Sequence, residues 1–284
     1  DIKVIKFSEF NDTIKENIDL IVVGVSSKGI EWVGEELSKF YNEKTNILLL
    51  TKGLAVIENQ FETLADKLEK ILKRKGATNP KISAVGGPCL ANGLANRIKS
   101  SVVIANKNIE IVKEIGKIIS TKYYSTEFSK DIVGVEVCAA IKNIYSMLIG
   151  ASVGLSSDNA DDNIKSKYYL NTAASLVHKS MSEMRKIVKK LNGNEETVFG
   201  LAGLGDLHVS AAGGRNSKMG SYLGKGMLFL DAKEEHMKEI TIEGAELALE
   251  IGPKILREFD KNEFPLLFSM LDAICNNKKL IIYW

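Results

Sequence analysis

An uninterrupted run of apolar residues, Leu20–Val25, constrains the fold of the first half of the chain more than any other feature. The run lacks the alternation of polar and apolar side chains that marks a strand with one face in water. A strand without that alternation is buried on both faces, as in parallel sheets that are covered by helices on either side. Residues 46–50 predict a second strand of the same buried kind.

Strand and helix candidates alternate through residues 1–131. The spacing of apolar residues predicts helices at 29–40, 57–74 and 109–119, and strands at 82–85 and 102–105, with an edge strand at 123–124. Strands that alternate with helices form mostly parallel sheets with helices on both faces. Residues 1–131 are therefore predicted to form an α/β domain with a parallel sheet.

The pattern changes at Asp131, after which helical periodicity dominates to the end of the chain. Residues 132–284 are therefore predicted to form an all-α second domain, with one of its loops at 203–216. Its longest apolar stretch, 134–154, is interrupted by Glu136, Lys142 and Asn143. A membrane-spanning helix needs about 20 mostly apolar residues, so this stretch predicts a buried core helix and no membrane span.

Charge and cysteine content narrow the classes of partner. The 284 residues carry 38 Lys and Arg against 36 Asp and Glu, a net charge of +2 without a long basic run, which argues against nucleic-acid binding. The three cysteines and three histidines show no metal-ligand spacing, so we expect no metal site. An odd number of scattered cysteines is typical of a reducing compartment, and we expect a cytoplasmic protein.

Lys142 is the first candidate for chemistry, because the predicted core helix surrounds it with apolar positions. A buried ammonium group is costly unless it is paired or its pKa falls. Two interpretations are open: a structural lysine tied to one buried carboxylate, and a catalytic lysine tuned by burial. The neighbouring Asn143 favours the second, because it adds another polar group in the same apolar setting.

Asp206, inside Gly203–Leu207, is a candidate for the buried carboxylate that pairs with Lys142. The alternative is a turn residue or a helix N-cap, which is the more frequent role of Asp beside Gly. The segment 213–218, with Arg215 and Asn216, precedes a predicted helix at 219–223. Glycines that open a helix leave backbone N–H groups free, which together with Arg suits a phosphate or carboxylate, although a plain glycine-rich loop fits too.

Two loops of the first half follow predicted strands. Thr51–Gly53 and Gly86–Cys89 both lie at carboxyl ends of the predicted parallel sheet, where ligands of open α/β sheets bind. Either segment also fits a simple turn from strand to helix.

These residues, taken in order along the chain, resemble the NAD(P)-dependent glycerol-3-phosphate dehydrogenases, most closely the bacterial and archaeal branch. Each segment is weakly specific by itself, but the ordered set is specific. The matching segments are 23–27, 51–54, Gly87-Pro88 with Ala91, 134–136, 140–145, 199–207, 213–216, 223–226 and Glu243-Gly244.

The resemblance implies a Rossmann-like first domain and an oxidoreductase that interconverts sn-glycerol 3-phosphate and dihydroxyacetone phosphate with NAD or NADP. Lys142 would act as general acid/base, with Lys52 and Asp206 as the other catalytic residues. The substrate would be bound by Lys52, Asn143, Ser210, Arg215 and Asn216, with the phosphate on the last two. The cofactor would be bound by Gly24, Ser26, Ala91, Arg215 and Glu243.

The sequence departs from the family pattern at three points. Gly93 stands where the family has Glu, and Lys179 where an Arg is common. The Gly-x-Gly-x-x-Gly turn is absent, because in the family it lies upstream of the point where this sequence begins. That turn belongs to the first βαβ unit, which binds the pyrophosphate and distinguishes NAD from NADP. The first domain is thus predicted to be incomplete here, and we expect the gene product to contain the unit.

Two other functions remain open from the sequence. A chain without the first βαβ unit fits a catalytically inactive homologue that binds a phosphorylated metabolite or a partner. Related two-domain folds oxidise other hydroxy acids, and analogy of fold alone does not separate them. The long helices of the second domain also offer surface for a homodimer.

Overall fold

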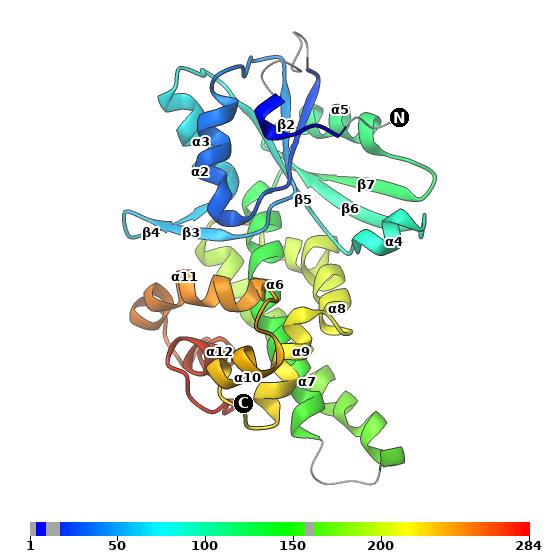
Figure 1. Ribbon diagram of the computed structural model, residues 1–284, viewed down its shortest axis with the longest axis vertical. Coiled ribbons are helices and arrows are strands. Elements are labelled where there is room, and N and C mark those ends of the chain that lie inside the picture. Colours follow the sequence, from blue (N-terminus) through cyan, green and yellow to red (C-terminus); the bar gives the residue numbers. More distant parts are fainter. Residues whose placement is uncertain (1–3, 10–17, 157–161) are drawn as a thin grey trace.

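A five-stranded sheet forms the first half of the molecule and a group of helices forms the second half (Figure 1). The computed structural model describes residues 4–9, 18–156 and 162–284. The strand order is β1-β2-β5-β6-β7, and every neighbouring pair is parallel except β5 and β6, so the predicted mostly parallel sheet is confirmed. The strands are β1 (Leu20–Val23), β2 (Asn46–Leu49), β5 (Lys81–Gly86), β6 (Ser100–Ala105) and β7 (Tyr124–Ser129).

β2 is covered on both faces, as its apolar run predicts. The same prediction is wrong for Leu20–Val25, because β1 lies at the edge of the sheet and Val22 is 48% exposed. In β2, Ile47 and Leu49 belong to the main hydrophobic core, whereas Leu48 points to the opposite face and joins a second cluster with Ile104 and Val112. The helices of this half are α2 (Ile30–Leu37), α3 (Leu64–Arg74), α4 (Ala91–Ala95) and α5 (Ile109–Ile119), with short 3-10 turns η1 (Phe7–Glu9) and η2 (Ser27–Gly29).

The long helix predicted at 57–74 is wrong in its first part. A β-hairpin precedes α3, with strands β3 (Leu54–Ile57) and β4 (Gln60–Thr63). Its two turn residues, Glu58 and Asn59, have φ angles of +49° and +59°, the left-handed backbone of a tight hairpin turn. The side chain of Thr63 then caps α3 by accepting a hydrogen bond from the Asp66 N–H at 3.1 Å. The helical spacing of the apolar residues misled because β3 packs on α6 and α11 of the second half.

The second half is helical throughout the part that the structure describes. A π-helical turn and a short helix replace the loop predicted at 203–216 up to residue 211, and that prediction is wrong there. The elements are α6 (Ile132–Leu155), α7 (Asp162–Lys190), η3 (Glu195–Phe199), η4 (Leu201–Gly205), α8 (Asp206–Ala211), α9 (Arg215–Gly224), α10 (Phe229–His236), α11 (Glu243–Glu258) and α12 (Pro265–Cys275).

Helix α6 is the centre of this half and packs against α7, α8, α9, α11 and α12. It is long and apolar enough to cross a membrane, but 94% of its most apolar window is buried against the rest of the protein. This agrees with the predicted buried core helix. The same helix also contacts β5 and the β3–β4 hairpin, so α6 joins the sheet to the helices of the second half.

Glycines let α6 and α9 touch backbone to backbone. A Cβ atom at Gly220 would overlap the carbonyl oxygen of Met147, and one at Gly150 would overlap the backbone of Ser217. This close approach brings the start of α9, with Arg215 and Asn216, against the middle of α6.

The glycine contact gives a first prediction. Gly220→Ala should lower the free energy of unfolding by about 1–3 kcal/mol, because the methyl group forces two closely packed helices apart. Gly93→Ala, whose nearest neighbour would be the Ile98 Cβ at 4.0 Å, is the matched control and should be neutral or stabilising. Urea denaturation of both variants measures the difference, and equal stabilities would contradict the packing argument.

Glu136 of α6 is buried, and its carboxyl group accepts a hydrogen bond from the Ala65 N–H at the start of α3, at 3.1 Å. Burial is the main cause that raises the pKa of Glu136 to about 8. The hydrogen bond from Ala65 opposes that shift because it favours the charged form.

This raised pKa predicts how stability depends on pH. The unfolded carboxyl group ionises near pH 4.3, whereas the folded one holds its proton to about pH 8. The stabilisation is therefore complete below about pH 4 and is lost progressively up to about pH 8. Glu136→Gln removes this titration, so its free energy of unfolding should fall less between pH 5 and pH 8.5 than that of the wild type. Parallel profiles from urea titrations would show that Glu136 is ionised in the folded state.

Candidate active site

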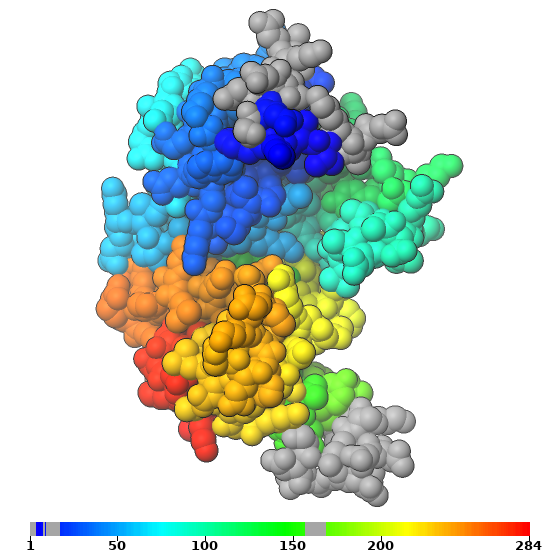
Figure 2. Space-filling model, in the orientation of Figure 1, coloured from blue at the N-terminus to red at the C-terminus, as the bar shows by residue number. Residues whose placement is uncertain are grey.

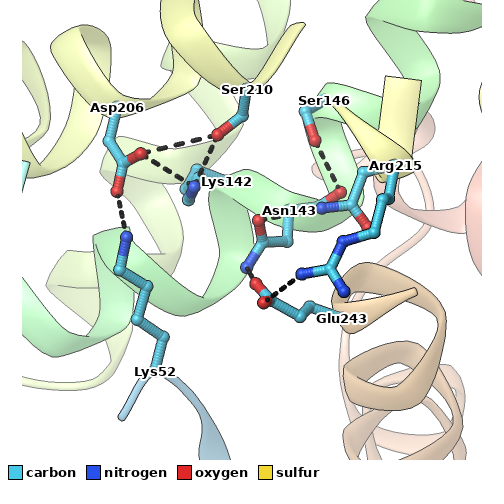
Figure 3. A network of polar contacts seen from close by, with 9 residues as sticks. Lys52, Lys142, Asn143, Ser146, Asp206, Ser210, Arg215 and Glu243 are labelled. Atoms are coloured by element: carbon cyan, nitrogen blue, oxygen red, sulfur yellow. Dashed lines mark hydrogen bonds and ion pairs between the residues drawn. The ribbon is translucent and has the colours of Figure 1, made fainter. Parts of the chain in front are cut away.

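One carboxylate bridges two lysines at the junction of the two halves (Figure 3). The Nζ atom of Lys142 lies 2.8 Å from Oδ1 of Asp206, and the Nζ atom of Lys52 lies 2.8 Å from Oδ2 of the same side chain. Lys142 and Asp206 have side chains that are 5% exposed, while that of Lys52 is 27% exposed. The Lys142 ammonium also donates to Oγ of Ser210 at 2.5 Å. Three candidate catalytic residues and one substrate-binding candidate thus meet at one point.

The local chain explains how Asp206 is aimed. It is the first residue of α8, directly after the π-helical turn η4. Gly203 of that turn has no room for a side chain, because a Cβ atom there would overlap the carbonyl group of Val198. The N-cap of α8 is Gly205, so Asp206 is not the N-cap that one interpretation of the sequence suggested. Its hydrogen bonds to the two lysines support the other, a buried carboxylate that pairs with Lys142.

The loop Gly86–Cys89 packs against the π-helical turn η4. A Cβ atom at Gly86 would approach that of Ala202 to 2.9 Å, and one at Gly205 would lie 3.4 Å from the Pro88 ring. Gly87 has a φ of +132°, which only glycine adopts easily. The structure therefore packs this loop against the segment that positions Asp206.

The environment of Lys142 lowers the pKa of its ammonium group. Burial is the largest cause, and the positive charge of Lys52 is the second. Asp206 opposes both through its charge and its hydrogen bond, and the charge of Glu243 acts in the same sense. The structure supports part of each interpretation of Lys142. The side chain has one buried carboxylate partner, and its pKa is nevertheless lower than that of a free lysine.

A second network lies beside the first and joins α6, α9 and α11. The Asn143 Nδ2 donates to Oε2 of Glu243 at 3.3 Å, and its Oδ1 accepts from Nδ2 of Asn216 at 3.0 Å. A guanidinium N–H of Arg215 donates to Oε1 of Glu243 at 3.1 Å. The Gly244 N–H donates to Oδ1 of Asn216 at 2.9 Å, which fixes the start of α11 against α9. All four candidates of this group are therefore neighbours. Figure 3 shows Asn143, Arg215 and Glu243 side by side.

A cavity of about 300 Å³ lies where the carboxyl ends of β1 and β2 face α11. Lys52 and Glu243 both line it, so the cavity touches both networks. Ser26 also lines it, whereas Gly24 and the exposed Ala91, at the start of α4, do not. The full lining is Val25, Ser26, Ser27, Leu50, Thr51, Lys52, Gly53, Thr241, Glu243, Glu246, Leu247 and Glu250.

Glu246 and Glu250 also line the cavity, although no motif in the sequence predicted them as site residues. With Glu243 they form one acidic stripe on α11, and that helical spacing was the signal available. Burial raises the pKa of Glu250. Among the residues that the structure describes, no group of His, Cys, Asp or Glu is arranged to hold a metal ion.

The bridge predicts the effect of Asp206→Asn. The amide leaves two ammonium groups close together without their shared anion, so the free energy of unfolding should fall by about 3 kcal/mol. Glu195→Gln, which weakens the half-exposed ion pairs with Arg185 and Lys189, is the control and should change stability by less than about 1 kcal/mol. Thermal or urea denaturation measures both, and a loss no larger than in the control would mean that Asp206 is not the counter-ion of both lysines.

Solved structures with this architecture define the class of protein: an α/β sheet domain of the Rossmann kind followed by a helical domain. A glycerol-3-phosphate dehydrogenase structure from Coxiella burnetii has a TM-score of 0.75 at 25% identity, and the match covers 93% of this chain and 75% of that one. The yeast glycerol-3-phosphate dehydrogenase structure, at 18% identity, shares the fold with a TM-score of 0.79 and covers 93% of this chain and 74% of that one.

The family follows from sequence models. The model of the NAD-dependent glycerol-3-phosphate dehydrogenase C-terminus matches residues 131–282, and the model of the N-terminus matches residues 3–112. The chain therefore belongs to the NAD-dependent glycerol-3-phosphate dehydrogenase family, which confirms the resemblance.

Named relatives agree with the family models. The "NADP(+)-dependent glycerol-3-phosphate dehydrogenase" of Archaeoglobus fulgidus is 30% identical over 220 residues, 78% of this chain and 63% of that protein. The "Glycerol-3-phosphate dehydrogenase [NAD(P)+]" of Fusobacterium nucleatum is 31% identical over 273 residues, 94% of this chain and 75% of that protein. The chain thus spans about two thirds to three quarters of the length of these relatives.

Proposed function

We propose that this protein interconverts dihydroxyacetone phosphate and sn-glycerol 3-phosphate by hydride transfer with NAD or NADP. The observation that carries the proposal is the buried Lys142–Asp206–Lys52 cluster beside the cavity at the carboxyl edge of the sheet. That edge is where ligands of open α/β sheets bind. Family membership and the names of the relatives support the choice of substrate.

The cofactor supplies or accepts the hydride when it is bound. The residues at the cavity fit such a ligand, because the Ser26 and Lys52 side chains line it and offer hydrogen-bond donors, and Arg215 stands close by on Glu243. We assign cofactor binding to Gly24, Ser26, Ala91, Arg215 and Glu243.

Lys142 is the proton donor in the reduction of the ketone. As the carbonyl carbon gains the hydride, the carbonyl oxygen takes a proton from the ammonium group, and the ketone becomes a secondary alcohol. Burial lowers the pKa of Lys142, which makes it a better acid near neutral pH. In the reverse direction the neutral amine takes the hydroxyl proton. Asp206 holds both lysines by hydrogen bonds, and Lys52 adds a second positive charge near the developing oxyanion.

The phosphate of the substrate fits the start of α9. Gly214 is the N-cap without a side-chain cap, so backbone N–H groups of the first turn are open to an anion. Arg215 supplies a charged fork that suits phosphate, and Asn216 is held in place by Asn143 and Gly244. We assign the phosphate to Arg215 and Asn216, and the rest of the substrate to Lys52, Asn143 and Ser210.

Domain organisation, location and assembly complete this proposal. We place the division between the dinucleotide-binding and substrate domains at 131/132, the protein in the cytoplasm and the assembly as a homodimer. The partners in this proposal are phosphorylated small molecules.

An assay with the Lys142→Met variant tests the mechanism. Oxidation of NADH or NADPH that depends on dihydroxyacetone phosphate should fall by about 10²–10⁴-fold in this variant, because the proton donor is lost. Lys113→Met, which breaks an exposed ion pair with Glu110 on α5, is the control and should keep full activity. Equal turnover in Lys142→Met and wild type would remove Lys142 from the mechanism.

The pH profile adds a second test of the same residue. Reduction needs the protonated ammonium, so its rate should fall as pH rises through the lowered pKa of Lys142, whereas the oxidation rate should rise. Activity on non-phosphorylated hydroxy acids instead would favour the related dehydrogenases. Binding of glycerol 3-phosphate without turnover of either nucleotide would favour an inactive homologue.

A further inference from the structure

We propose that Lys254 is a positioning residue: it fastens the tip of the β3–β4 hairpin to α11 and thereby sets the place of Lys52 beside Lys142 and Asp206. The hairpin follows directly on the loop that carries Lys52, and Figure 1 shows it lying along α11. The kinetic part of this inference rests on the proposed function, whereas its geometric part does not.

Lys254 makes an unusual set of contacts for a residue in the middle of a helix. Its side chain is 6% exposed, and its Nζ donates to the backbone carbonyl of Asn59 at 2.7 Å, across to the tip of the hairpin. The same Nζ lies 2.5 and 2.6 Å from the two carboxylate oxygens of Glu258, and 5.1 Å from the centre of the Phe61 ring. One ammonium group therefore joins α11 to both the turn and β4.

The hairpin is stiff enough to transmit this position. β3 and β4 pair along their whole length, from Leu54 opposite Thr63 to Ile57 opposite Gln60. Leu54 is buried close to Lys52, and a Cβ atom at Gly53 would lie 3.2 Å from Leu64. A shift of the hairpin tip thus moves the loop of Lys52 through paired strands rather than through a slack connection.

The anchoring helices are those that carry the rest of the site. α11 begins with Glu243, which lines the same cavity as Lys52, and nearer its other end Lys254 binds the hairpin tip at Asn59. The Phe61 ring also meets Phe259 just beyond α11, at 5.8 Å. The chain just after β4 is held by Glu136 of α6, the helix that also carries Lys142, because its carboxyl group accepts a hydrogen bond from the Ala65 N–H at the start of α3. Figure 2 shows the resulting close seam between the blue and orange parts of the surface.

A lysine at this place is better explained by geometry than by stability. Lys254 is buried, but the side chain of Glu258 is 39% exposed, so its carboxylate keeps much of its water and the ion pair contributes little net free energy of folding. What Lys254 provides is a directed hydrogen bond to the backbone carbonyl of Asn59. That bond fixes the turn at a defined position, as a positioning role requires.

The ionisation of Lys142 reports on that position even without catalysis. The charge of Lys52 lowers the pKa of Lys142, whereas Asp206 and Glu243, the carboxylates that face it, raise it. If Lys52 moves away, its repulsion weakens and the pKa of Lys142 should rise. Lys52→Met gives the upper limit of that rise.

The experiment compares Lys254→Met with the wild type in two readouts. The first is the pKa of Lys142, from the pH dependence of its acetylation followed by peptide mass spectrometry. The second is kcat and KM for dihydroxyacetone phosphate. We expect a higher pKa of Lys142 and a loss of roughly 10- to 100-fold in kcat/KM, the scale for a catalytic group misplaced by about 1 Å. Lys254→Arg, which keeps the donor, should restore both.

Two controls separate positioning from general destabilisation. In a Lys52→Met background, Lys254→Met should change neither readout further, because it acts through Lys52. Lys186→Met is the matched control: Lys186 donates to the Glu263 carbonyl at 3.1 Å and lies 5.9 Å from the Phe264 ring, and neither of these partners belongs to the hairpin. It should leave the pKa of Lys142 and kcat/KM unchanged.

An unchanged pKa of Lys142 in folded Lys254→Met, or effects that add to those of Lys52→Met, would overturn the inference. If Lys254→Met does not fold, Phe61→Leu serves in its place and should raise the pKa by a smaller amount; no rise would again overturn it. A wild type that is inactive with both nucleotides would count against the proposed function alone, because the acetylation readout needs no turnover.

Discussion

The salt bridge of Asp206 with two lysines is the central interaction of this structure. It joins Lys52, from the loop after a parallel strand, to Lys142, in the central helix of the other half. Because Lys142 and Asp206 are nearly dry, their charges must be matched where they are, and neither partner can be removed without leaving a charge unpaired. The first half therefore has to place Lys52, and the second half has to place both Lys142 and Asp206.

Several close contacts position the side chains of the candidate site. The π-helical turn before Asp206 requires glycine at position 203, because a side chain there would overlap Val198, and the loop at Gly86 and Gly87 lies against this turn. The glycine contact between α6 and α9 places Asn216 on Asn143. The hairpin after Lys52 rests on α11 through Lys254. Each of these contacts is a close approach or a directed bond rather than a large apolar surface, so small changes there should affect geometry before they affect the fold.

The arrangement also accounts for the electrostatics of the site. Lys142 experiences burial and a neighbouring ammonium group, which loosen its proton, and a carboxylate that moderates both. A ketone that gains a hydride needs a proton donor of this kind beside its oxygen, and the lowered pKa suits operation near neutral pH. The second network, with Glu243 shared by Asn143 and Arg215, lies close enough to bind the remainder of a small phosphorylated ligand.

The two-domain architecture and most of the candidate site residues can be predicted from the sequence. The apolar run of β2 predicts a strand buried on both faces, and the loss of that pattern after Asp131 predicts the helices. The similar run Leu20–Val25 forms a strand, but at the edge of the sheet, where Val22 is exposed. A lysine in an apolar helix needs a partner, and Asp206 was the candidate.

Three features of the structure depend on contacts between segments that are remote in sequence. Residues 57–63 form a hairpin instead of helix because they lie on α6 and α11, a surface that local spacing cannot encode. Asp206 accepts hydrogen bonds from Lys52 as well as Lys142 because the loop of Lys52 meets the start of α8 across the junction. Lys254 reaches the hairpin turn, a contact between residues remote in sequence that no periodicity announces.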